Sequence, residues 1–267
     1  MAMGSTPAQA IHSSIAALAL EAGVSEPTVN RFCRSLETRG FPDFKLHLAQ
    51  SLAHGTLYVN RNVDEDDSVE SYTGKIFESA MASLDQVHHS LDMSAVNRAV
   101  DLLTQAKKIA FFGLGSSAAV AHDAMNKFFR FNVPVIYSDD IVLQRMSCMN
   151  CDDDDVVVII SHTGRTKSLV ELAQLAREND AMVIALTSAG TPLAREATLA
   201  ITLDVPEDTD IYMPMVSRLA QLTVIDVLAT GFTLRRGAKF RDNLKRVKEA
   251  LKESRFDKEP FVPSDNQ

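Results

Sequence analysis

From residue 107 to residue 203, short apolar runs alternate with segments in which apolar residues recur every three or four positions. The runs indicate strands buried on both faces, and the periodic segments indicate helices. The predicted strands are 109–112, 133–137, 156–160, 183–187 and 199–203. This alternation is typical of parallel sheets with right-handed crossovers, so we predict an α/β fold: a flavodoxin-like, five-stranded parallel sheet with helices on both faces.

Helical patterns flank the predicted sheet. We expect connecting helices at about 69–91 and 94–106 after an acidic stretch, and a long apolar helix at about 215–234 before a basic tail. The pattern predicts four regions along the chain. They are an all-α domain at 1–57, an acidic linker with connecting helices at 58–97, the sheet domain at 98–237 and a basic helical tail at 238–267.

Two polar loops follow predicted strands and lead into predicted helices: 113–117, GLGSS, and 161–166, SHTGRT. Parallel strands end at one sheet edge, where open α/β sheets bind ligands. Helix N-termini and close-lying backbone N–H groups favour an anion there. One such loop is equally well explained as an ordinary capped helix, and the second favours a site. The candidate residues are Gly115, Ser116, Ser117, Ser161, Thr163, Gly164 and Thr166, the last as a helix N-cap.

Residues 13–38 predict two short helices joined by a tight turn. Ser14 and Ser25 are placed as N-caps, and Gly23 suits the positive φ of the turn. The apolar face of the second helix comprises Val29, Phe32, Cys33 and Leu36. This arrangement is typical of the helix-turn-helix, whose second helix enters the DNA major groove.

The predicted DNA contacts are polar residues on and around the second helix: Ser25, Thr28, Asn30, Arg31, Arg34 and Lys45. Thr28, Asn30 and Arg31 are placed to reach base edges, whereas Arg34 and Lys45 are placed to meet phosphates. A helical hairpin with a solvated polar face is the alternative. It stays open because residues 1–60 carry four Lys and Arg against four Asp and Glu, and charge alone then gives weak DNA affinity.

Net charge, cysteine content and the length of apolar runs exclude several classes of protein. The 267 residues carry a net charge of −8, which excludes a protein coated in basic residues but not a local basic surface. Three cysteines do not make a disulfide framework, so we expect a reducing, cytoplasmic location. No apolar run reaches the length of a membrane span. The opening Met1–Ser5, MAMGS, is typical of an expression-tag remnant.

Three other chemistries fit parts of the sequence. Residues 113–118 match the dinucleotide fingerprint G-x-G-x-x-A, with Asp139 or Asp140 as ribose acid, but an NAD enzyme leaves 161–166 without a role. A sugar-phosphate isomerase would need a base, for which His122, His162 and Glu171 are available.

Cys148 and Cys151 form a C-x-x-C that a redox or zinc site could use. No second pair accompanies it, so we interpret both as unpaired thiols and expect neither a metal nor a cofactor.

These motifs resemble a known family. Residues 25–45, SEPTVNRFCRSLETRGFPDFK, resemble the helix-turn-helix signature of RpiR-family transcription factors, although Glu37 stands where the family often has glycine. The loops GLGSS and SHTGRT resemble the two phosphosugar-binding loops of the sugar isomerase (SIS) domain. Together these regions cover most of the chain in the family's order.

The resemblance implies a cytoplasmic repressor of hexose-catabolism genes, without isomerase activity, that forms a homodimer or homotetramer through its SIS domain. It implies a phosphorylated sugar acid, 2-keto-3-deoxy-6-phosphogluconate, as the effector that releases operator DNA. The residues implied to hold this effector are Ser116, Ser117, Ser161, Thr163 and Thr166. Family members carry further helix before the helix-turn-helix, so we expect that domain to be N-terminally truncated here.

Overall fold

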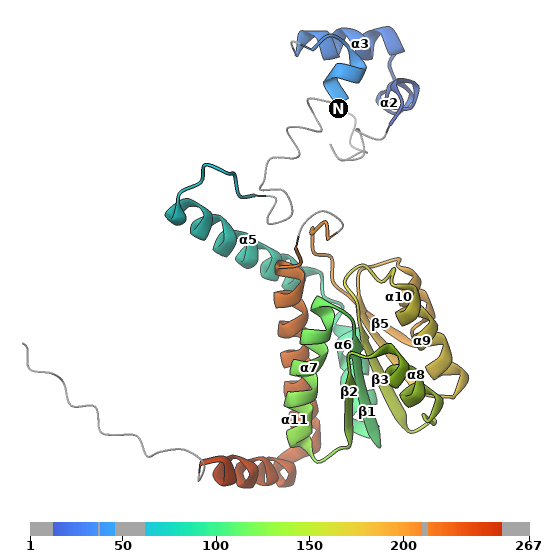
Figure 1. Ribbon diagram of the computed structural model, residues 1–267, viewed down its shortest axis with the longest axis vertical. Coiled ribbons are helices and arrows are strands. Elements are labelled where there is room, and N and C mark those ends of the chain that lie inside the picture. Colours follow the sequence, from blue (N-terminus) through green and yellow to red (C-terminus); the bar gives the residue numbers. More distant parts are fainter. Residues whose placement is uncertain (1–12, 37, 46–61, 210–212, 253–267) are drawn as a thin grey trace, which may run out of the picture. The chain divides into compact units, whose positions relative to one another are not determined.

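The computed structural model describes residues 13–36, 38–45, 62–209 and 213–252 (Figure 1). These residues group into two compact units. The first contains the described residues before 80 together with those of the segment 208–213, and the second contains 80–207 and the described residues from 214 onward. The division falls within the helix α5 (Val69–Ser90).

The second unit is built on a five-stranded parallel sheet, as predicted. Its strands are β1 (Lys108–Gly113), β2 (Val135–Ser138), β3 (Asp155–Ile160), β4 (Met182–Thr187) and β5 (Leu199–Thr202). The spatial order β2-β1-β3-β4-β5 is that of the flavodoxin-like sheet. In such a sheet the strand order reverses beside β1, and ligands bind beyond the carboxyl ends of the strands there.

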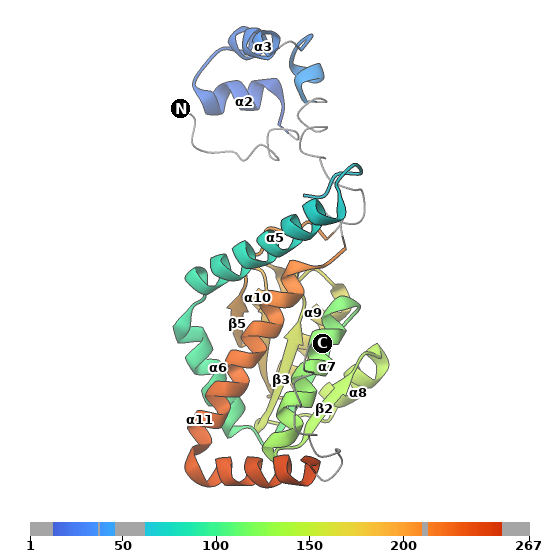
Figure 2. The ribbon, with the colours of Figure 1, turned by 90° about the vertical axis from the view of Figure 1, so that its left-hand side faces the viewer.

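Helices cover both faces of the sheet (Figures 1 and 2). Alternate strand residues supply the two cores: Phe111 and Val158 pack with α6, α7 and α11, whereas Phe112 and Val157 pack with α8 and α9. The helix bounds are α6 (Met93–Gln105), α7 (Ser116–Phe128), α8 (Ile141–Met149), α9 (Lys167–Glu178), α10 (Pro192–Glu196) and α11 (Val216–Lys252), with the 3-10 turn η1 (Phe129–Phe131) after α7. Since strand side chains point alternately up and down, one buried run serves both cores.

The predicted long apolar helix and basic tail form the single element α11, which breaks at Gly237 (φ 76°). Phe232 and Phe240 flank this break, and the Arg236 guanidinium lies 5.1 Å from the centre of the Phe232 ring. The tail is therefore helical as far as Lys252, while residues 253–267 lie outside the described part.

The first unit contains α2 (Ile15–Ala22) and α3 (Glu26–Ser35), and residues 41–45 are also helical. Ser14 caps α2 by accepting a hydrogen bond from the Ala17 N–H, and Gly23 has φ 65°, as predicted. The predicted apolar face of α3 is only half right. Val29 and Cys33 are buried, but Phe32 and Leu36 are 57% and 49% exposed, because the small cluster formed with α2 and Phe41 covers a narrow part of the helix.

Candidate functional site

Three polar loops leave the sheet side by side at its carboxyl edge. The register places Gly113 of β1 opposite Ile160 of β3, and Ile160 opposite Leu186 of β4. The first loop (113–117), the second loop (161–166) and a third loop (187–191) therefore start next to one another. The Ser161 N–H donates to the Leu186 carbonyl at 3.1 Å, which ties the second loop to β4 just before the third loop begins.

The first loop turns tightly into α7. A Cβ at Gly113 would lie 2.7 Å from the Ser117 carbonyl oxygen, so the sharp turn requires glycine. Gly115 has φ 57° and precedes the first helical residue, Ser116. Ser117 is buried and Ser116 is half-buried. The first-turn N–H groups of α7 and the Ser116 hydroxyl therefore share one helix N-terminus, which favours an anion.

The second loop is held in place by close packing. Gly164 has φ 56°, and a Cβ there would lie 2.3 Å from the Thr191 hydroxyl oxygen. Ser161 is buried, Thr163 is half-buried, and Thr166 occupies the N-cap position of α9 without a side-chain cap bond. The exposed cations Arg165 and Lys167 flank Thr166 in the sequence. Hydroxyls, a helix N-terminus and nearby positive charge together suit a phosphate.

The third loop was missed in the sequence interpretation. Ser188 donates from both its N–H (3.0 Å) and its hydroxyl (2.8 Å) to the His162 carbonyl. The Thr187 and Thr191 hydroxyl oxygens lie 3.3 Å apart beside Gly164. The signal was present, because residues 187–191, TSAGT, follow a predicted strand and precede Pro192 just as the other loops precede helices.

One of the two candidate ribose acids of the dinucleotide fingerprint, Asp140, has a structural role. The Asp140 carboxylate caps α8, accepting from the N–H groups of Val142 (2.8 Å) and Leu143 (2.9 Å). Its Oδ1 thus serves the helix N-terminus, whereas Asp139, the other candidate, is exposed.

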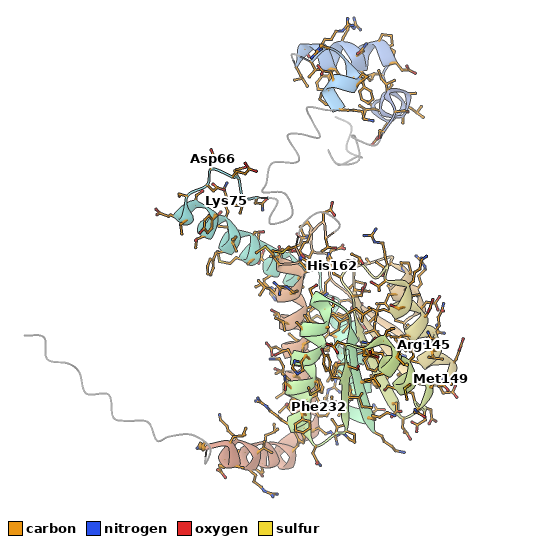
Figure 3. The ribbon with its side chains drawn as sticks, in the orientation of Figure 1. Asp66, Lys75, Arg145, Met149, His162 and Phe232 are labelled. Atoms are coloured by element: carbon orange, nitrogen blue, oxygen red, sulfur yellow. The ribbon has the colours of Figure 1, made fainter. Side chains whose placement is uncertain are left out.

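The candidate bases for isomerase chemistry have other partners. The exposed His122 ring stacks on Tyr137, with 4.9 Å between ring centres, and Glu171 pairs with Arg145 of α8 at 3.4 Å. His162 lies at the end of the sheet near the start of α11 (Figure 3), where its Nε2 donates to the Glu207 carbonyl at 3.3 Å. Arg145, the partner of Glu171, lies on α8 in the same view.

The C-x-x-C cysteines are free thiols, as interpreted. Cys148 lies on the buried face of α8, and burial raises the pKa of its thiol to about 12. A thiol with so high a pKa is a poor nucleophile and metal ligand at neutral pH. Among the described residues, two closely spaced groups could hold a metal by geometry: Asp85 with His88 and His89, and Asp152–Asp154, which directly follows Cys151. All six residues are exposed, and neither group includes a cysteine.

Three of the predicted DNA contacts gather at the start of α3. The hydroxyl oxygens of Ser25 and Thr28 lie 2.9 Å apart, and Arg31 Nη2 donates to the Thr28 hydroxyl at 3.4 Å. Ser25, Arg31 and Arg34 are exposed. The polar N-terminal turn of the second helix is the part that a helix-turn-helix presents to base edges.

Two of the remaining three predicted contacts have a role inside the unit, whereas the third, Arg34, is exposed. Asn30 Oδ1 accepts from the Phe41 N–H at 3.1 Å and packs against Gly40, which leaves no space there for a Cβ. Lys45 Nζ donates to the Ser13 carbonyl at 3.1 Å and lies 5.7 Å from the centre of the Phe41 ring. Both side chains tie the 41–45 segment to the two helices.

Known proteins match both parts of the chain. The family "Helix-turn-helix domain, rpiR family" matches residues 3–55, and the family "SIS domain" matches residues 102–231. The HTH-type transcriptional regulator HexR of Escherichia coli (strain K12) is 90% identical over 262 residues, covering 98% of this chain and 91% of that protein. HexR of Pseudomonas aeruginosa is 58% identical over 250 residues, covering 94% and 88%.

Solved structures share the fold. The Vibrio vulnificus NanR protein complexed with ManNAc-6P has a TM-score of 0.66 at 24% identity, covering 94% of this chain and 90% of that chain. The sugar isomerase domain of an RpiR transcription factor from Sphaerobacter thermophilus has a TM-score of 0.58 at 18% identity, covering 68% and 98%. None of the described helices is long and apolar enough to cross a membrane. With its rpiR-type helix-turn-helix, its SIS domain and its near-identity to HexR, the chain belongs to the RpiR family of transcriptional regulators.

Proposed function

We propose that this protein is a cytoplasmic repressor of hexose-catabolism genes that releases operator DNA when its SIS domain binds 2-keto-3-deoxy-6-phosphogluconate. It acts as a homodimer or homotetramer and has no isomerase activity. The observation that carries the sensor part is the meeting of the loops after β1, β3 and β4 at one sheet edge, next to the N-termini of α7 and α9.

The chemistry of these loops suits a phosphorylated ligand. Ser116, Ser161 and Thr163 offer neutral hydroxyl donors, and the first turns of two helices offer backbone N–H groups. Such sites bind a phosphate group without a metal and leave the rest of the ligand to be recognised by neighbouring groups. The partners of Glu171 and His162 support a sensor rather than an isomerase, since Glu171 pairs with Arg145 and the His162 Nε2 bonds to the Glu207 carbonyl.

Calorimetric titration tests the effector. We expect 2-keto-3-deoxy-6-phosphogluconate to bind, and glucose 6-phosphate and NAD to bind far more weakly or not at all. Ser161→Ala should weaken binding by about 1–2 kcal/mol through the lost hydroxyl, whereas the exposed Ser94→Ala should not. Tight binding of NAD, or a Ser161→Ala affinity equal to that of the parent, would refute the assignment.

Operator titration tests the DNA-reading part. Arg31→Ala should lower discrimination between operator and random DNA by about 1–3 kcal/mol, because we expect the exposed Arg31 guanidinium, in the middle of α3, to contact a base edge. Arg34→Ala should weaken both kinds of DNA equally and reduce the salt dependence. An equal loss on both DNAs for Arg31→Ala would reassign Arg31 to a phosphate.

A further inference from the structure

The segment Asp204–Glu207, which we call the junction, follows β5 and touches three parts of the second unit. Gln86 of α5 donates from Nε2 to the Asp204 carbonyl at 2.9 Å. His162 of the second loop donates to the Glu207 carbonyl at 3.3 Å. The junction thereby joins a proposed effector loop to α5, the helix in which the two compact units divide.

The Glu207 side chain fixes the junction to a third element, α11. Its carboxylate accepts from the N–H groups of Met215 (2.7 Å), Val216 (2.8 Å) and Ser217 (3.2 Å), and from the Ser217 hydroxyl. A carboxylate at a helix N-terminus satisfies N–H groups that have no partner within the helix, and it is stabilised by the helix dipole. Glu207 is therefore anchored by its side chain while its main chain meets His162.

His162 ties the second loop to the third loop, so the second loop cannot shift unless His162 shifts with it. The His162 carbonyl accepts from both the N–H and the hydroxyl of Ser188 in the third loop. His162 lies between Ser161 and Thr163, two of the proposed phosphate contacts. A ligand that draws these hydroxyls together shifts His162, and the Glu207 carbonyl receives that shift directly.

We propose that Glu207 is a positioning residue that couples the effector loops to α5. The proposal rests on the proposed function and adds the route by which effector binding reaches the DNA-reading unit. The Glu207 side chain is held at the start of α11, while its main chain is bonded to His162. A displacement of His162 therefore moves the junction main chain as far as Asp204, and the hydrogen bond from Gln86 transmits that movement to α5. The effector then favours the arrangement of α5 in which the protein binds the operator poorly. Linkage requires this preference, because a ligand shifts an equilibrium only when it binds one arrangement better than the other.

The test compares operator affinity with and without saturating 2-keto-3-deoxy-6-phosphogluconate. Glu207→Gln weakens the anchor at nearly constant shape, and Gln86→Ala removes the α5 contact from an exposed position that folding tolerates. We expect both variants to keep the separate affinities for effector and operator within about threefold, while the ratio of the two operator affinities falls about tenfold. Asp140→Ala, which removes the carboxylate cap of α8, is the matched control and should keep the ratio.

A parental ratio in both variants, or an equal loss in Asp140→Ala, overturns the coupling role. Hydrogen exchange separates this from failure of the effector assignment, because it needs no ligand. Glu207→Gln should speed amide exchange at residues 80–90 as well as at the start of α11, and unchanged exchange at 80–90 overturns the proposal even where the sugar acid has no effect on the parent.

Discussion

At Gly164 the backbone has φ 56° and a Cβ would lie 2.3 Å and 2.5 Å from the hydroxyl oxygens of Thr191 and Thr187. Gly164→Ala should therefore lower the free energy of unfolding by about 2–4 kcal/mol, through left-handed strain and overpacking together. Gly190→Ala is the control, because Gly190 has φ 68° with nothing within 4 Å, and it should cost only about 1–2 kcal/mol. Urea unfolding measures the free energy of unfolding of both variants. Equal decreases in the two variants would show that overpacking at Gly164 makes no contribution.

The Cys148 thiol gives stability a defined dependence on alkaline pH. Burial raises its pKa to about 12, whereas the pKa of a thiol in the unfolded chain is about 8.5. Below the unfolded pKa this contribution is fully present, and it is lost as pH rises toward 12, by about 1.4 kcal/mol per pH unit. The free energy of unfolding of the parent minus that of Cys148→Ala should fall accordingly from pH 9 to pH 10. A constant difference would show that the folded thiol ionises normally.

At the scale of the element, α3 carries most of the predicted DNA contacts and also helps to hold its unit together. Asn30→Ala leaves the Phe41 N–H without its acceptor, so the free energy of unfolding of the first unit should fall by about 1–3 kcal/mol. The exposed Arg34→Ala should change it by less than about 0.5 kcal/mol. Circular dichroism melts compare the two. If Asn30→Ala instead melts like the parent and loses only operator specificity, Asn30 reads bases as the sequence predicted.

At the scale of the whole molecule, the proposed effector site lies entirely within the second compact unit. An effector at one hundred times its Kd stabilises the unit that binds it by about 2.7 kcal/mol. For a unit of this size that raises the midpoint of unfolding by about 5–10 °C. Calorimetric scans should show this rise for the second unit and an unshifted transition for the first. A common shift of both would mean that the units unfold together.

The elements followed from the sequence because they depend on local patterns, and the sheet order followed from the alternation of strands and helices, which is typical of the flavodoxin-like fold. Buried parallel strands such as 156–160 are continuous apolar runs, and caps such as Ser14 and turn glycines such as Gly23 act within a few residues. The first and second loops were identified for the same reason. Each is a polar stretch between a strand and a helix, and parallel strands bring such stretches to one edge.

Only the tertiary structure decided which polar groups are left for a ligand. Asn30 and Lys45 look outward on a helical pattern, but a third helical segment packs beside them and uses their hydrogen bonds. The place of the third loop in the site follows only from the register of β3 and β4. The role of Glu207 follows only from its contact with His162, which lies more than forty residues away in the chain. Local periodicity determines which faces of an element are apolar, whereas the partner of a polar side chain depends on which distant segments the folded chain brings beside it.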